Sequence, residues 1–138
     1  MLISTKTGYA LRALSALAEQ PAEKPLSVAV LCRNNNLPQK YIEQLFSQLK
    51  HSNLIKSVQG SKGGYLLNKQ CSDISLKDIM TAVDDILPAG TCYGGSNESE
   101  FCLGYPCPFS DFWDDVKKNI ENYFDSITLD QIFSNLRR

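Results

Sequence analysis

The chain has 138 residues, of which 43% are hydrophobic and 21% charged, a composition typical of a soluble globular protein about one domain in size. Its apolar runs are too short to cross a bilayer, which takes about 20 residues. The N-terminal segment has neither the continuous apolar core nor the small-residue cleavage site of a secretory signal. These features do not suggest a membrane-spanning or exported protein, and we expect a cytoplasmic one.

The charge is unevenly divided along the chain. The formal net charge is −1, but residues 1–69 carry nine Lys or Arg against three acidic residues, whereas residues 70–138 carry five against twelve. Such asymmetry indicates that a polyanion, if one is bound, contacts the N-terminal half only. Charge alone also allows both halves to be ordinary solvated surface.

Two helices are predicted before residue 36. Residues 5–20 have an apolar stripe at helical spacing, formed by Tyr9, Leu11, Leu14, Leu17 and Ala18. Ser27 is a suitable N-cap for a short helix, SVAVLCR, and three consecutive asparagines, 34–36, tolerate the tight turn that follows.

A third helix is predicted over residues 38–51, with Pro38 in its first turn. Its apolar residues recur at i, i+3, i+4 and i+7 and predict a single buried face; they are Ile42, Leu45, Phe46 and Leu49. The opposite face carries Gln39, Lys40, Glu43, Ser47 and Lys50.

Residues 54–67 read as a two-stranded hairpin, because LIKSV and YLL are strand-like and the GSKGG between them is a glycine turn. Two helices, a turn, a third helix and a hairpin follow one another in the order of a winged helix-turn-helix. We therefore predict an α+β, mainly helical fold, with a DNA-binding domain over residues 1–69.

The second half predicts three further elements. Ser75-x-x-Asp78 is a capping-box start for a helix over 76–87, and a cysteine-bearing loop follows. A long amphipathic helix begins at Phe109, and Thr128-x-x-Gln131 starts a short terminal helix. We assign residues 70–108 to a connecting helix and sensor loop, and 109–138 to a dimerisation helix and a C-terminal helix.

The long helix has an aromatic face that needs a cover. Its members are Phe109, Phe112, Trp113, Val116, Ile120, Tyr123, Phe124 and Ile127. A second copy of the chain is the favoured cover, since helix-turn-helix proteins commonly bind two half-sites as dimers. The alternative is that this helix packs back on the first helix of its own chain.

The third helix is the predicted recognition helix, whose N-terminal side chains reach base edges in the major groove. Gln can pair with adenine, Lys with guanine or phosphate, and Glu with the cytosine amino group. For Glu43 the alternative is a helix-surface partner, with Gln39 or Ser47 as neighbours. Lys56, Lys62 and Lys69 flank the hairpin, where they could contact the DNA backbone or minor groove, although any one of them alone is an ordinary surface residue.

Several segments carry a family resemblance over nearly the whole chain: STKTGYALRAL, YIEQLFSQLKHSNLIKSVQGSKGGYLL, ISLKDIMTAVD and SITLDQI. The chain resembles the winged helix-turn-helix regulators of the Rrf2 type, which include the iron–sulfur cluster regulator IscR and the nitric-oxide-responsive repressor NsrR. The resemblance implies a homodimer with crossed long helices that binds double-stranded operator DNA. It also implies a cysteine loop that in many members holds an iron–sulfur cluster controlling DNA affinity.

Carried over by position, the resemblance assigns Lys6, Tyr41, Glu43, Gln44 and the wing from Gln59 to Gly64 to the DNA-facing surface. The whole predicted set is Lys6, Gln39, Lys40, Tyr41, Glu43, Gln44, Ser47, Gln59, Gly60, Ser61, Lys62 and Gly63. Relatives often have Arg where this chain has Gln59, so minor-groove contact and target sequence are expected to differ here.

Five cysteines in a chain without an export signal favour metal or redox chemistry over a disulfide scaffold. Cys92, Cys102 and Cys107 share the loop and supply three thiolates for an iron–sulfur cluster, whereas a closed zinc site needs four good ligands. A switch based on thiol oxidation, or a loop with no sensing role, is the alternative. Cys32 reads as a core residue, and Cys71 is undecided.

The fourth cluster ligand is not evident. Some relatives supply a His three residues after the last cysteine, which is Ser110 here, and others an acid at the position of Gly8. The only histidine, His51, lies at the end of the third helix, and candidate substitutes are Glu98, Glu100 and Asp111.

Two other classes of function fit the sequence less well. A thiol or iron–sulfur redox enzyme would need a catalytic cysteine with a nearby base, yet the chain has no CxxC and its single His is distant. A winged domain that binds a protein instead of DNA does not account for the basic N-terminal half. We therefore predict a regulator and not an enzyme.

Overall fold

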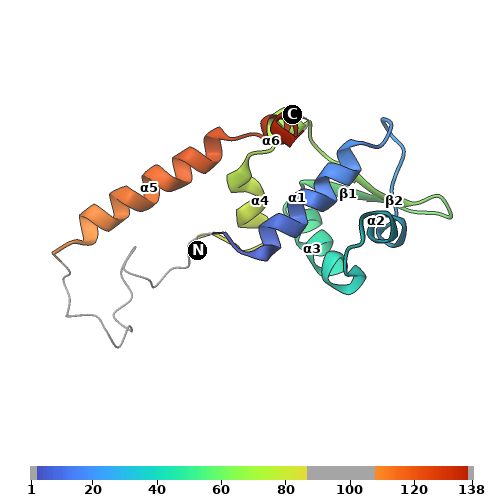
Figure 1. Ribbon diagram of the computed structural model, residues 1–138, viewed down its shortest axis with the longest axis horizontal. Helices are drawn as coiled ribbons and strands as arrows, with labels where there is room; N and C mark the ends of the chain where they lie inside the picture. Colours follow the sequence, from blue (N-terminus) through green and yellow to red (C-terminus); the bar gives the residue numbers. More distant parts are fainter. Residues whose placement is uncertain (1–2, 87–107, 137–138) are drawn as a thin grey trace.

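The computed structural model describes residues 3–86 and 108–136. Within them, a helical domain with a small two-stranded sheet is followed by a long helix that extends away from it (Figure 1). The predicted fold class, α+β and mainly helical with a winged helix-turn-helix and a long C-terminal helix, is confirmed.

The first helix, α1 (Thr5–Ala18), begins where Ser4 caps it by accepting a hydrogen bond from the backbone N–H of Lys6. It ends slightly before the predicted residue 20, as the chain turns toward Pro21. Helix α2 (Val28–Asn35) starts at the predicted cap, since the Ser27 hydroxyl accepts from the N–H of Val30 at 3.3 Å. Asn36 then adopts a left-handed conformation, which ends α2.

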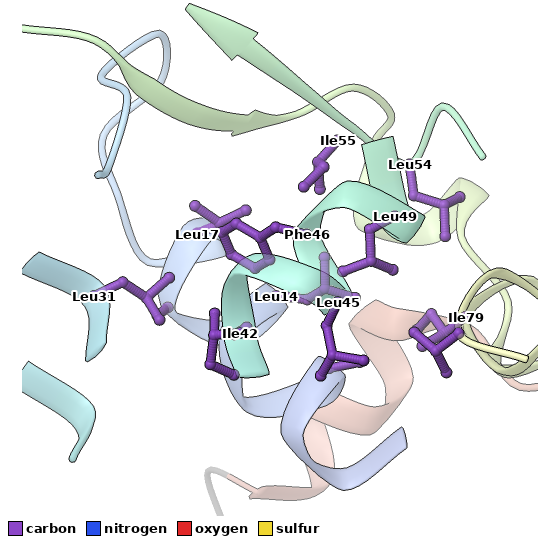
Figure 2. Packing of buried hydrophobic residues seen from close by; sticks show 14 of the residues in the cluster. Leu14, Leu17, Leu31, Ile42, Leu45, Phe46, Leu49, Leu54, Ile55 and Ile79 are labelled. Atoms are coloured by element: carbon purple, nitrogen blue, oxygen red, sulfur yellow. The ribbon is translucent and has the colours of Figure 1, made fainter. Parts of the chain in front are cut away.

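Helix α3 (Gln39–His51) buries the four apolar residues predicted from their spacing. Figure 2 shows Ile42, Leu45, Phe46 and Leu49 among the packed core residues, with Leu14 and Leu17 of α1 and Leu31 of α2. Phe46, Leu49 and Ile42 are fully buried, so α3 is fixed by its inner face while its other face stays in solvent.

Strands β1 (Ile55–Val58) and β2 (Gly64–Leu67) form the predicted hairpin, in antiparallel register with Ile55 opposite Leu67. A third segment, which the sequence pattern does not predict, joins this hairpin. Leu26 makes an isolated bridge to Tyr65, with N···O distances of 3.1 and 2.9 Å. The hairpin is thereby anchored to the segment that leads into α2.

The predicted helix over 76–87 is shorter than expected. After a 3₁₀ turn, η1 (Cys71–Asp73), helix α4 covers Leu76–Ala82 only. The capping box is present, because Ser75 and Asp78 each accept a hydrogen bond from the other's backbone N–H. The helix ends early because Asp84 adopts a left-handed conformation and the carboxylate of Asp85 binds the start of α1.

The last two helices, α5 (Ser110–Ser126) and α6 (Leu129–Leu136), are tied to α4 at one point. Ser75 and Thr128 form an antiparallel bridge, and its flanking backbone bonds, Leu76 N to Ile127 O and Leu129 N to Ile74 O, are both 2.8 Å. Beside the bridge, Leu76, Met80 and Phe124 form a second small core.

Helix α5 does not fold back along α1, which was the alternative to a partner copy. Figure 1 shows its N-terminal half extending away from the domain. Leu11 is the α1 residue that packs against the second small core, at the C-terminal end of α5.

Candidate nucleic-acid interface

The outward face of α3 carries five of the residues predicted to contact DNA. Gln39, Lys40, Glu43, Gln44 and Ser47 are all exposed to solvent, opposite the buried apolar face. Because the whole inner face of α3 is packed, these side chains stand on a rigid support. Such a surface can present donors and acceptors to a groove at little conformational cost.

The start of α3 is held against α1 by two tyrosines. The rings of Tyr41 and Tyr9 meet edge to face, with centroids 5.3 Å apart, and the guanidinium carbon of Arg12 lies 6.0 Å from the Tyr9 ring centroid. Tyr41, which the family resemblance assigned to the DNA surface, is half-buried. Its ring therefore has a packing role whether or not its hydroxyl reaches DNA.

Two polar residues on the outward face of α3 contact each other. The amide nitrogen Nε2 of Gln39 donates a hydrogen bond to the Oε1 of Glu43, one helical turn away, at 3.1 Å. Both side chains are exposed. The helix-surface partner considered for Glu43 is thus present, and it is Gln39.

The wing is the tight turn between β1 and β2. Gln59, Gly60, Ser61 and Lys62 are exposed at its tip, and the N–H of Gly63 donates to the carbonyl of Gly60 at 3.0 Å. A Cβ at Gly63 would lie only 2.2 Å from the carbonyl oxygen of Val58. The glycines are therefore needed for the shape of the turn, and the exposed tip leaves its backbone accessible.

The wing and the recognition helix share a support. Tyr65 of β2 is bonded to Leu26 on one side, and its ring lies against that of Phe46 of α3, with centroids 4.9 Å apart. This contact fixes the position of the hairpin relative to α3. The two surfaces predicted to face DNA thus belong to one rigid unit.

Lys6 is placed apart from the other predicted residues. It lies half-buried at the N-terminal end of α1, which Figure 1 shows directed toward α4, whereas the wing lies on the opposite side of the domain. A contact with DNA from Lys6 would therefore be made away from the wing.

A hollow beside the wing adds residues that the sequence did not single out. It lies between the turn that joins α1 to α2 and the wing tip, and Lys24, Ser27 and Val30 line it together with Lys62. Lys24 is flanked by turn-forming residues, and nothing in the sequence pattern shows that the fold brings it near Lys62.

The two cysteines outside the loop lie in environments that raise the pKa of a thiol. Cys32 is in the core, as predicted, where burial raises the pKa of its thiol and the Glu43 carboxylate raises it further. Burial likewise raises the pKa of the half-buried Cys71, with a smaller contribution from Asp130. Both environments therefore disfavour the thiolate, which is the form that binds a metal.

The predicted cluster cysteines, Cys92, Cys102 and Cys107, lie outside the described residues, as do Glu98 and Glu100. Over residues 3–86 and 108–136, no group of three or more His, Cys, Asp or Glu side chains could hold a metal ion. Gly8 is exposed on α1, and a Cβ added there would meet nothing within 4 Å. Ser110 is the first residue of α5.

In the described part of the chain, every helix is too short or too polar to span a membrane.

Comparison with known proteins places nearly the whole chain in one family. The profile of Rrf2, described as an iron-dependent transcriptional regulator, matches residues 3–135. The HTH-type transcriptional regulator IscR of Serratia proteamaculans is 34% identical over 137 residues, which is 98% of this chain and 80% of that protein. The IscR of Pectobacterium carotovorum is 32% identical with the same coverage.

Solved structures agree. IscR from T. potens superposes with a TM-score of 0.68 at 32% identity, covering 97% of this chain and 87% of that one. CymR, the global cysteine regulator of B. subtilis, gives a TM-score of 0.72 at 28% identity, covering 96% of each chain. An oxidized form of Staphylococcus aureus CymR gives 0.66 at 30% identity, covering 96% of this chain and 95% of that one.

Proposed function

Since the chain belongs to the Rrf2 family of transcriptional regulators, we propose that it acts as a homodimer that binds operator DNA sequence-specifically and changes its DNA affinity in response to a signal at its loop cysteines. The observation that carries the DNA-binding part is the rigid unit of α3 and the wing. A polar, exposed helix face and an exposed glycine turn are fixed to each other through Phe46 and Tyr65.

Helix α3 supplies the base contacts. Its exposed side chains offer a cation at Lys40, a carboxylate acceptor at Glu43 and an amide at Gln44, which together can distinguish base pairs in the major groove. Glu43 adds little affinity, because a carboxylate is repelled by the phosphates. Its value lies in selecting a base that donates a hydrogen bond.

The wing supplies contacts to the backbone and minor groove. Lys62 at its tip and Lys24 beside it face the same hollow, so they extend the basic surface of the N-terminal half. Gln59 stands where relatives often have Arg and carries no charge. We expect minor-groove binding to depend on Lys62 and on the exposed backbone of the turn.

Dimerisation would cover the aromatic face of α5. In the single chain, Phe109, Phe112 and Tyr123 are each more than half exposed, at 63, 58 and 65%. Large aromatic side chains gathered along one side of a helix are costly to leave in water, and a second α5 is a self-complementary cover. A dimer would also present two recognition helices to two half-sites.

For the signal, we propose an iron–sulfur cluster held by Cys92, Cys102 and Cys107. Three thiolates suit three corners of a cluster, and the group would supply redox and ligand-exchange chemistry that a protein side chain lacks. The two positions from which relatives supply a fourth ligand hold Gly8, which has no side chain, and Ser110, whose hydroxyl is a poor ligand. Asp111, in the first turn of α5, is a candidate.

A second signal is favoured by the structural neighbours. Two CymR structures superpose well on this chain, and one of them is an oxidized form. The alternative proposal is therefore a cluster-free regulator in which thiol oxidation or a protein partner changes DNA affinity. Both proposals keep the same DNA-binding surface.

The first experiment is to purify the protein without oxygen, measure iron, sulfide and visible absorption per chain, and select operators from a random DNA library. A brown protein whose affinity for the selected DNA changes on chelation supports cluster sensing. A colourless protein whose DNA affinity changes on thiol oxidation supports the thiol switch, provided that oxidation no longer changes the affinity once Cys92, Cys102 and Cys107 are replaced by Ser. Identical affinity in all forms would overturn both signals.

Two variants test the DNA surface with the selected operator. Lys40→Glu should weaken binding to all sequences, and Glu43→Ala should change base preference at one position of each half-site. Lys118→Glu, on the exposed side of α5, is the matched control and should leave both unchanged. If neither α3 variant altered operator binding, the assignment of α3 as the recognition helix would be wrong.

A further inference from the structure

We propose that Gln39 is a positioning residue for Glu43: its amide fixes the carboxylate in the orientation that selects cytosine, instead of reading a base itself. The inference rests on the proposed function and assigns a specific role to one side chain of the recognition surface. It starts from the hydrogen bond between Gln39 Nε2 and Glu43 Oε1, 3.1 Å long, in the first turns of α3.

The chemistry of the pair fixes which way the amide points. A glutamine amide has two N–H donors and one oxygen acceptor, whereas an ionised carboxylate only accepts. The reverse amide orientation would set two oxygens against each other, so the charged Glu43 selects the donor orientation. Hydrogen bonds to a charged acceptor are stronger than those between neutral groups, which favours keeping this one when DNA approaches.

The bond has two consequences for Glu43. The Gln39 amide occupies Oε1 of the exposed carboxylate, so Oε2 is the oxygen that is offered to a base. It also restricts a long exposed side chain that otherwise samples several rotamers. An acceptor held in this way meets the N4 amino group of cytosine favourably and the O4 of thymine unfavourably.

Gln39 itself is less suited to read a base while it is paired. Bidentate recognition of adenine requires the amide oxygen and one N–H to face the base edge together. The bond to Glu43 directs one N–H of the amide toward the next turn of the helix and not toward a base. The residue before the helix, Pro38, makes no side-chain hydrogen bond to cap it. The hydrogen bond of the Gln39 side chain is made to Glu43.

The test compares Gln39→Leu, Glu43→Ala and the double variant on the selected operator and on operators changed at each position in turn. Leucine has a similar size and keeps the helix, but it cannot donate. We expect Gln39→Leu to lower the preference for cytosine over thymine by roughly three- to tenfold, at the same position that Glu43→Ala changes, since it removes part of one base contact. In the Glu43→Ala background, Gln39→Leu should have no further effect.

Gln48→Leu is the matched control, because Gln48 is exposed on the same helix and lies outside the predicted DNA-binding set. It should leave base preference at every position unchanged, and all variants should keep the unfolding midpoint of the wild type. If Gln39→Leu instead relaxed a preference at a different position, additively with Glu43→Ala, Gln39 would be a direct base reader. No change at any position would equally overturn the inference.

Failure of the proposed function gives a different result. A wild-type protein that selects no sequence from the library would overturn DNA binding by this surface, and with it the role of Gln39. That outcome appears before any variant is made, so it cannot be confused with the failure of the Gln39 assignment alone.

Discussion

The carboxylate of Asp85 accepts a hydrogen bond from the hydroxyl of Thr7, which precedes it by 78 residues. The same oxygen accepts from the backbone N–H of Ser4 at 3.0 Å. Thr7 is almost fully buried, so the pair closes the contact between the start of α1 and the end of α4. A carboxylate at a helix N-terminus is also favoured by the helix dipole.

This contact should make part of the free energy of unfolding depend on pH in the acid range. Burial acts to raise the pKa of Asp85, but the hydrogen bonds from Ser4 and Thr7 outweigh it and lower the pKa on balance. A lowered pKa means stabilisation that is complete above the pKa of the unfolded chain, about 4, and lost as the pH falls through the folded value. Asp85→Asn should therefore cost about 1 kcal/mol at pH 7.

Urea unfolding at a series of pH values checks this prediction. The difference between wild type and Asp85→Asn should stay constant from pH 7 to about pH 5 and shrink below about pH 4. Asp84→Asn is the neighbouring control, since Asp84 is exposed and asparagine tolerates its left-handed conformation. A difference that persisted unchanged into strong acid would exclude the charge as the cause.

Ser75 should contribute more to stability than either of its partners. Its hydroxyl accepts from the N–H of Asp78 at 3.0 Å and donates to Oδ1 of Asp125 at 3.1 Å, so one buried group caps α4 and holds α5. Ser75→Ala should lower the free energy of unfolding by about 1–2 kcal/mol. Asp125→Ala removes one of these bonds and should cost less. Equal effects in chemical denaturation would contradict this division.

Replacing each of two glycines with alanine should change the stability in opposite directions, because one has no room for a Cβ and the other has. A Cβ at Gly64 would lie 2.4 Å from the carbonyl carbon of Leu26, so Gly64→Ala must displace the anchoring bridge and should destabilise the wing domain by about 2 kcal/mol or more. Gly8 lies within α1 with nothing near its side-chain position, and Gly8→Ala should stabilise by about 0.5–1 kcal/mol. Thermal unfolding of the two variants should thus shift the midpoint in opposite directions.

Lysines beside the wing should set the salt dependence of DNA binding. If Lys62 neutralises one phosphate, Lys62→Ala lowers the slope of log affinity against log salt by about 0.9, and it weakens binding equally on all sequences. Lys24→Ala should behave similarly, because it lines the same hollow. Lys118→Ala on α5 serves as the control with an unchanged slope. A loss confined to the selected operator would instead indicate base contact.

Much of the fold follows from local signals in the sequence. The spacing of apolar residues gave the buried face of α3, the Gly-rich turn gave the hairpin, and Ser27 and Ser75 marked helix starts that the structure confirms. Each of these signals depends on residues within a few positions of one another, and so it can be read along the chain.

The features that the sequence did not predict depend on distant partners. Helix α4 stops early because Asp85 binds the start of α1, and Leu26 joins β2 across about 40 residues. The sequence left Gln39 and Ser47 as possible partners of Glu43, and the structure has Gln39. The choice depends on side-chain rotamers, which the spacing of residues does not predict. The DNA-facing set and the loop cysteines stay predictions.

The bridge between Ser75 and Thr128 makes the intervening chain a closed ring. Two backbone bonds of 2.8 Å flank this bridge, and within the ring Ile79 of α4 is buried in the core and Asp85 is bonded to the start of α1. Neither strand of the hairpin nor any part of α3 belongs to this ring. Cys92, Cys102 and Cys107 fall in sequence between the two joined points, so a signal at these cysteines, as proposed above, would reach the rest of the chain through α4, α5 and this bridge. The surface predicted to contact DNA would then keep its shape. Regulation would then change the spacing between the two recognition helices of a dimer and leave each helix intact.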